Sequence, residues 1–140
     1  MSTQRIIYQT PDGGVAVVVP APNSGLSIQE LAAKDVPAGV PADIVEVSEI
    51  PTDRTFRNAW EKLGRAVVTN LGKAKGIAHD KRRAARAKEF APLDVEATIP
   101  AKAAQAEAAR QAIRDKYATM QSQMDAATTV EELKSLLPQE

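Results

Sequence analysis

Few side chains of this chain have a type and spacing that could do chemistry. The 140 residues include no cysteine and a single histidine, His79, which excludes disulfide bonds, cysteine nucleophiles and thiolate or multi-histidine metal sites. Asp94 and Glu96 fall on different helical faces, and Asp43, Glu46 and Glu49 lack the ordered ligand spacing of a cation loop. We therefore expect no catalytic residue, no metal site, no cofactor and no enzymatic activity.

Charged side chains are segregated along the chain, although its net charge is zero. Residues 1–64 carry −3, residues 65–91 carry +6 and residues 92–140 carry −3. The basic stretch, where His79 is expected to be solvated, either folds against its acidic neighbours or is simply hydrated, or else it contacts an acidic partner or nucleic acid. It supplies three candidate partner-binding residues: Arg82, Arg83 and Arg86. Nucleic acid is a less favoured partner for the basic helix 73–88, because stacking aromatic rings are scarce around it.

The elements that must position these side chains begin with a small sheet. Two β-branched segments, residues 5–9 and 15–19, flank a turn that contains proline and glycine, which predicts a hairpin. Residues 27–34 open with a Ser-x-x-Glu capping box and predict a short helix. Residues 42–47 alternate as a strand does. Together they predict a β-β-α-β unit over residues 1–50, the first part of an α+β protein.

Residues 51–64 are predicted to form a short amphipathic helix that closes this unit. Their apolar side chains recur at helical spacing: Phe56, Ala59, Trp60 and Leu63. Gly64 could end the helix in the left-handed conformation. The two aromatic rings would either plug the open face of the sheet or form a docking surface, since Trp and Arg are frequent at interface hot spots. The second interpretation adds four candidate partner-binding residues: Arg54, Phe56, Arg57 and Trp60.

Residues 65–140 are predicted to be helical, with breaks near Pro92 and Pro100. Residues 70–89 are basic and alanine-rich, and residues 101–124 carry a narrow apolar seam. The seam comprises Ala106, Ala109, Ile113, Tyr117, Met120 and Met124, of which Ile113, Tyr117 and Met120 are candidate partner-binding residues. It could pack against residues 70–89 as a helical hairpin, or join copies of the chain as a short coiled coil and homo-oligomer. A capped apolar stripe predicts a last short helix before Pro138.

Four phrases of the sequence resemble a known group of proteins. They are Pro51–Glu61, Lys73–Arg86, Arg110–Asp115 and Ala126–Lys134. They resemble phrases of small tail-region proteins of tailed bacteriophages, a group that is tail assembly chaperone-like. In the order given, the matching phrases of that group are P-x-D-R-x-F-R-x-A-W, a basic helix, R-Q-x-L-R-D and a tail that reads A-T-x-E-E-L-K. The interruptions at Pro92 and Pro100 depart from the longer helical passage of that group.

The resemblance implies that the chain binds another phage tail or fibre protein during assembly in the host cytoplasm, and it implies no catalytic residues. The alternative is a structural virion component, such as a tail adaptor or a fibre- or capsid-associated subunit. A second alternative is nucleic-acid binding through the basic helix. No run of about 18 apolar residues is present, so we expect no membrane partner.

Overall fold

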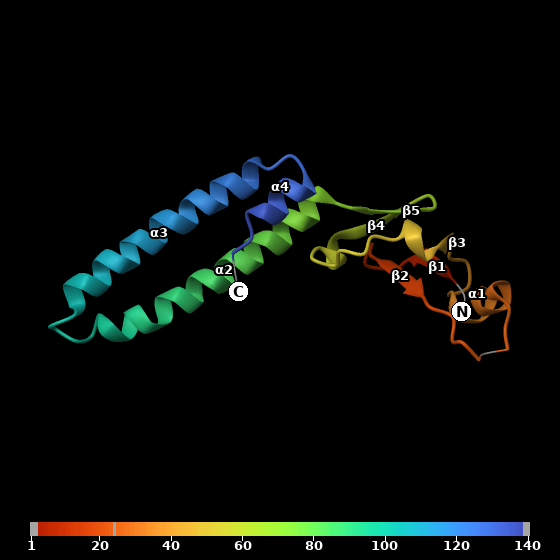
Figure 1. The fold of residues 1–140 in the computed structure, drawn as a ribbon, viewed down its shortest axis with the longest axis horizontal. Coiled ribbons are helices and arrows are strands. Elements are labelled where there is room, and N and C mark those ends of the chain that lie inside the picture. Colours follow the sequence, from red (N-terminus) through yellow and green to blue (C-terminus); the bar gives the residue numbers. More distant parts are fainter. Residues whose placement is uncertain (1–2, 24, 139–140) are drawn as a thin grey trace. The chain divides into compact units, whose positions relative to one another are not determined.

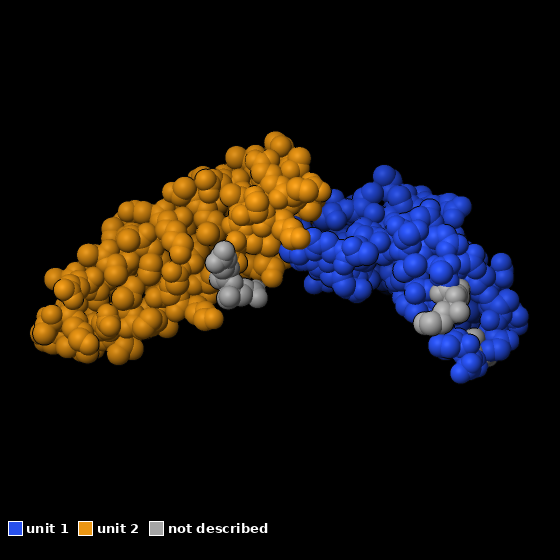
Figure 2. All heavy atoms as spheres, viewed as in Figure 1, with its two compact units in different colours: residues 1–70 blue, residues 71–140 orange. Residues whose placement is uncertain are grey.

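The computed structural model describes residues 3–23 and 25–138 (Figure 1). The chain forms two compact units, which are coloured separately in Figure 2. We call residues 1–70 the N-terminal unit and residues 71–140 the helical unit. Strands and one short helix make up the first, and long helices make up the second, which confirms the predicted α+β class.

The N-terminal unit is built on a three-stranded antiparallel sheet. Its strands are β1 (Gln4–Gln9), β2 (Val15–Val18) and β3 (Ala42–Glu46), in the order β2-β1-β3. Ile7 of β1 lies opposite Val17 of β2 and Asp43 of β3. This confirms the predicted hairpin and the third strand.

Local sequence explains the connections of this sheet. Gly13 adopts a φ of 87° in the turn between β1 and β2, a conformation that other residues rarely take. Helix α1 (Ile28–Asp35) follows β2 and begins at Ser27 with the predicted capping box to Glu30. A 3₁₀ turn, η1 (Val47–Glu49), ends the β-β-α-β pattern after β3.

Residues 51–64 do not form the predicted helix. A 3₁₀ turn, η2 (Arg57–Ala59), leads into a second antiparallel hairpin of β4 (Trp60–Leu63) and β5 (Ala66–Thr69). Short helices are marginal in water, whereas pairing with the β-branched strand β5 provides backbone hydrogen bonds for Trp60–Leu63. Gly64 does take a positive φ of 60°, but as the turn of the hairpin. The N-terminal unit therefore extends to Asn70, beyond the predicted boundary at residue 64.

The helical unit contains α2 (Leu71–Glu96), α3 (Ala103–Ala126) and α4 (Val130–Ser135). Helices α2 and α3 lie side by side as a hairpin, and α4 packs back against α2 (Figure 1). Of the two predicted arrangements of these helices, the structure therefore shows the helical hairpin, which forms within one chain. Thr129 caps α4 by accepting a hydrogen bond from the backbone N–H of Glu132, as one of the predicted capping boxes requires.

Pro92 does not break the helix as predicted, because α2 continues through it to Glu96. Pro92 removes one backbone hydrogen bond, the one to the Lys88 carbonyl, and both residues are exposed, so solvent can satisfy that acceptor. The turn comes later, over residues 97–102, which contain Pro100. The Thr98 hydroxyl donates to the Val95 carbonyl at 2.7 Å and satisfies one acceptor at the helix end.

The predicted apolar seam lies on the face of α3 that packs against α2. Ala106, Tyr117 and Met124 are buried on it, Ala74 and Ala78 are buried on α2, and the two helices pack against each other. Small side chains let the two helices approach closely, but they bury little apolar area.

Candidate binding surfaces of the helical unit

The aromatic residues of the predicted docking surface lie inside the N-terminal unit. Phe56 is 3% exposed and Trp60 is 2% exposed, and Trp60 packs with Ile7, Val15 and Val45. Of the two interpretations, the structure has the one in which the rings fill the core. Neither ring can meet a partner directly.

The two arginines of that motif support the tryptophan. The Arg57 guanidinium lies 4.4 Å from the centre of the Trp60 ring, and that of Arg54 lies 5.8 Å from it. Arg57 Nη2 also donates to the Val15 carbonyl at 2.7 Å. Burial, and secondarily the charge of Arg54, lower the pKa of Arg57. Arg57 therefore holds the core residue Trp60 in place.

In the helical unit, Tyr117 and Glu89 tie α3 to α2. The Tyr117 hydroxyl donates to Glu89 Oε2, and Lys116 Nζ lies 3.2 Å from Glu89 Oε1. The hydrogen bond from Tyr117 is the main cause of a lowered pKa of Glu89, with Lys116 adding to it against the effect of burial. Burial and the Glu89 carboxylate raise the pKa of Tyr117 to about 12.

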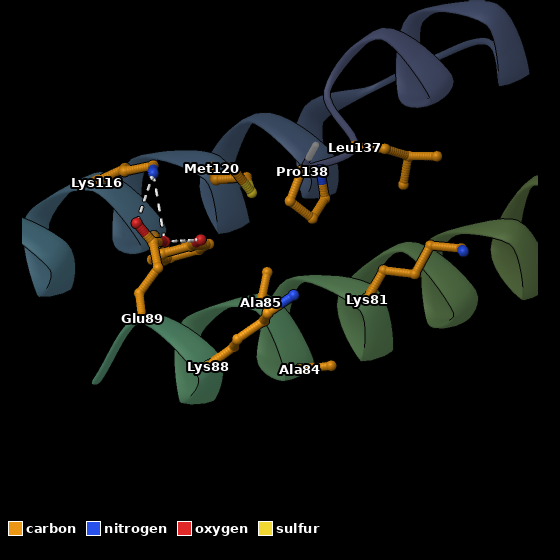
Figure 3. A pocket seen from close by; sticks show the side chains of 10 residues that line it. Lys81, Ala84, Ala85, Lys88, Glu89, Lys116, Met120, Leu137 and Pro138 are labelled. Atoms are coloured by element: carbon orange, nitrogen blue, oxygen red, sulfur yellow. Dashed lines mark hydrogen bonds and ion pairs between the residues drawn. The ribbon is translucent and has the colours of Figure 1, made fainter. Parts of the chain in front are cut away.

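One open groove of about 940 Å³ lies beside this contact. Residues from α2, α3 and the segment after α4 line it: Lys81, Ala84, Ala85, Lys88, Glu89, Lys116, Tyr117, Met120, Leu137 and Pro138 (Figure 3). We call it the lysine-rimmed groove. Met120, Leu137, Pro138 and the alanines give it apolar walls, while the three lysines surround them. Predicted residue Met120 belongs to this groove, whereas Ile113 is half-buried in the seam and lines neither groove described here.

A second, smaller recess of about 280 Å³ lies on an adjoining face of α2 and α3. It is lined by Arg82, Arg83, Arg86, Ala87, Arg114, Tyr117, Ala118 and Gln121, and we call it the arginine-lined groove. The structure thus brings the three predicted arginines of α2 together with Arg114 of α3. Sequence reasoning missed Arg114, because the register between the two helices is not visible in a single sequence.

His79 and its neighbours connect the start of α2 to the end of α3. His79 Nε2 lies 2.8 Å from Asp125 Oδ1, and Lys75 Nζ donates to the Asp125 carbonyl at 2.8 Å. Arg82 Nε donates to His79 Nδ1 at 3.2 Å. The His79 side chain is only 14% exposed, which corrects the expectation that it is solvated. The cause is the contact with α3.

Arg82 is the most buried charged side chain among the described residues, with 7% exposure. Burial lowers its pKa, the charges of Arg83 and Arg86 lower it further, and Asp125 opposes them. No group of three metal-ligating side chains occurs among residues 3–23 and 25–138. Within the same ranges, no helix has the length and apolar character needed to cross a bilayer.

No family model, curated protein or solved structure matches the chain.

Proposed function

We propose that this chain is a tail-region protein of a tailed bacteriophage that binds another phage protein during assembly, as a chaperone-like factor in the host cytoplasm. The phage context is supported by the four sequence phrases described above. Binding of a polypeptide is supported by one structural observation, the lysine-rimmed groove.

The groove offers a partner apolar contacts that the helical unit does not make by itself. Most of the buried hydrophobic residues described in the helical unit are alanines. Met120, Leu137 and Pro138 in the groove are only partly buried. A partner side chain that enters between them would remove apolar surface from water at about 25 cal/mol per Å². Lys116 is already paired with Glu89, and the other two lysines at the rim would orient a partner that carries carboxylates.

The test is capture of the partner from cells infected with the phage that encodes this chain. Tagged protein should retain a tail or fibre protein, identified by mass spectrometry. Ala84→Glu places a charge in the groove at an exposed helical position, and it should abolish this capture. Ala108→Glu is the matched control, because Ala108 is exposed on α3 and lines neither groove.

Two results would contradict the proposal. Equal capture by the wild type and Ala84→Glu would show that the groove does not hold the partner. Stoichiometric presence of the chain in purified virions would identify it as a structural virion component, the alternative function.

A further inference from the structure

We propose that the arginine-lined groove binds an acidic segment of the partner polypeptide. The four guanidinium groups of the groove would donate hydrogen bonds to the carboxylates of that segment. This inference rests on the proposed function and names a second contact for the same partner. It is carried by the juxtaposition of Arg82, Arg83 and Arg86 with Arg114 around one recess.

The groove concentrates positive charge without an internal counter-charge. Four of its eight lining residues are arginines, and none of the described residues that line it is acidic. The nearby carboxylates do not line the recess, although two of them pair with groove arginines from outside it. Asp80 pairs with Arg83 at 2.9 Å, Glu107 is shared by Arg110 and Arg114, and Asp125 contacts His79.

Asp80 neutralises the charge of Arg83 only weakly. The Arg83 and Asp80 side chains are 63% and 79% exposed, and ion pairs that exposed contribute little in water. Arg82, in contrast, is buried beside Arg83 and Arg86, so its charge is repelled by both. An anionic group in the recess would relieve this repulsion.

The side chains are held in place before any ligand arrives. The Arg86 guanidinium stacks 4.6 Å from the centre of the Phe90 ring, and that of Arg114 lies 5.9 Å from it. Arg82 is fixed by its hydrogen bond to His79. A stacked guanidinium keeps its N–H edges available, and their fork geometry matches a carboxylate.

The same contacts favour a polypeptide over a nucleic acid. Single-stranded nucleic acids are bound by stacking bases on exposed rings. The Phe90 ring is already covered by Arg86, and Tyr117 is 3% exposed with its hydroxyl on Glu89. A recess of about 280 Å³ admits one or two side chains, not a duplex. Aspartate and glutamate side chains fit both the size and the charge.

The experiment measures binding of a fluorescein-labelled hexaglutamate peptide to the full chain by fluorescence anisotropy. Hexaglutamine with the same label controls for the peptide backbone and the dye, and single-stranded oligothymidylate tests the nucleic-acid alternative. We expect the hexaglutamate peptide alone to bind, and its affinity to fall as ionic strength rises from about 0.05 M to about 0.5 M.

Two variants remove charge from the groove and one removes it elsewhere. Arg83→Gln changes an exposed side chain and keeps the fold, and Arg86→Gln removes the stacked guanidinium. Each should weaken hexaglutamate binding about tenfold, the loss of one charge-assisted hydrogen bond. Lys102→Gln is the matched control, since it removes the same charge from an exposed position of the helical unit and lines neither groove. It should change the affinity less than about twofold. Circular dichroism verifies that each variant is folded.

Four outcomes would overturn the inference. They are no hexaglutamate binding at low salt, an equal loss for Lys102→Gln and Arg83→Gln, tighter binding of oligothymidylate that depends on Arg83, and self-association of the chain that Arg83→Gln abolishes. The last would assign the groove to a second copy.

Failure of this inference is distinguishable from failure of the proposed function. If hexaglutamate does not bind but a phage protein is still captured and lost in Ala84→Glu, only the acidic contact is wrong. If hexaglutamate binds as expected but Ala84→Glu leaves capture unchanged, the role of the lysine-rimmed groove is wrong instead.

Discussion

At the scale of single residues, Trp60 connects the two sheets of the N-terminal unit. It belongs to β4, yet it packs against Ile7 of β1 and Val15 of β2. Leu63, three residues later, is 69% exposed. In the helix predicted from sequence, both would have faced the core. Their different burial is the direct consequence of the strand.

Trp60→Ala should lower the free energy of unfolding by about 3–5 kcal/mol, because it empties a large site in the core. Leu63→Ala is the control and should change it by less than about 0.5 kcal/mol. Urea denaturation followed by circular dichroism measures both. A comparable cost for the two variants would contradict the hairpin and favour the amphipathic helix.

Tyr117 and Glu89 make the stability of the helical unit depend on pH at both extremes. Folding raises the pKa of Tyr117 from 10.0 to about 12, so its contribution is complete below pH 10 and is lost as pH rises toward 12. Folding lowers the pKa of Glu89, so its contribution is complete above the ordinary glutamate range and is lost as pH falls through the folded pKa.

Tyr117→Phe should flatten both limbs of the profile of Tm against pH. It removes the phenol that titrates at high pH, and it removes the hydrogen bond that is the main cause of the lowered pKa of Glu89. Thermal unfolding followed by circular dichroism gives the profile, with Tyr8→Phe as the control. An unchanged acid limb in Tyr117→Phe would show that the hydrogen bond to Glu89 does not form.

At the scale of elements, two glycines with open surroundings should respond in opposite directions to alanine. A Cβ at either Gly64 or Gly76 would meet no atom within 4 Å. Gly64 has a φ of 60° in the β4–β5 turn, whereas Gly76 lies in the interior of α2. Steric space is therefore equal, and backbone conformation alone distinguishes them.

Gly64→Ala should destabilise the protein by about 1–2 kcal/mol, the cost of placing an L-residue in the left-handed region. Gly76→Ala should stabilise it by about 0.5–1 kcal/mol, because alanine loses less backbone entropy in a helix. Urea titrations of the two variants against the wild type measure the difference. Destabilisation by Gly76→Ala would mean that α2 is not helical at that position.

At the scale of the whole molecule, the cores of the two units differ in the size of their buried hydrophobic side chains. The N-terminal unit buries Ile6, Ile7, Val45, Phe56 and Trp60 among its large side chains. Of the seven buried hydrophobic residues described in the helical unit, four are alanine: Ala74, Ala78, Ala106 and Ala127. Less apolar area means a smaller hydrophobic contribution to the stability of α2 and α3.

Amide hydrogen exchange on the full chain should therefore show slower exchange in β1 than in α2 and α3. Binding of the partner should slow exchange in α2 and α3, because a ligand of the folded state stabilises it. Mass spectrometry of peptides after timed exchange measures both. Slowest exchange in the α2–α3 hairpin of the free chain would contradict this view of its core.

Short-range signals in the sequence were sufficient for much of the fold. The β1–β2 turn, the capping box at Ser27 and the seam of α3 were each predicted from neighbouring residues and are confirmed, and the strand predicted over residues 42–47 is present at 42–46. These features depend on turn geometry, capping and periodicity, which act over a few residues.

Tertiary contacts decided the rest. Phe56, Trp60 and Leu63 suit a helix by spacing, but pairing with β5 and burial of Trp60 against β1 and β2 made the segment a strand. Likewise, the sequence determined that Arg82, Arg83 and Arg86 share a basic helix, but only the packing of α3 on α2 added Arg114 and buried His79. The physical reason is that spacing along the chain specifies a face, whereas the opposing residue depends on a register set by many distant contacts.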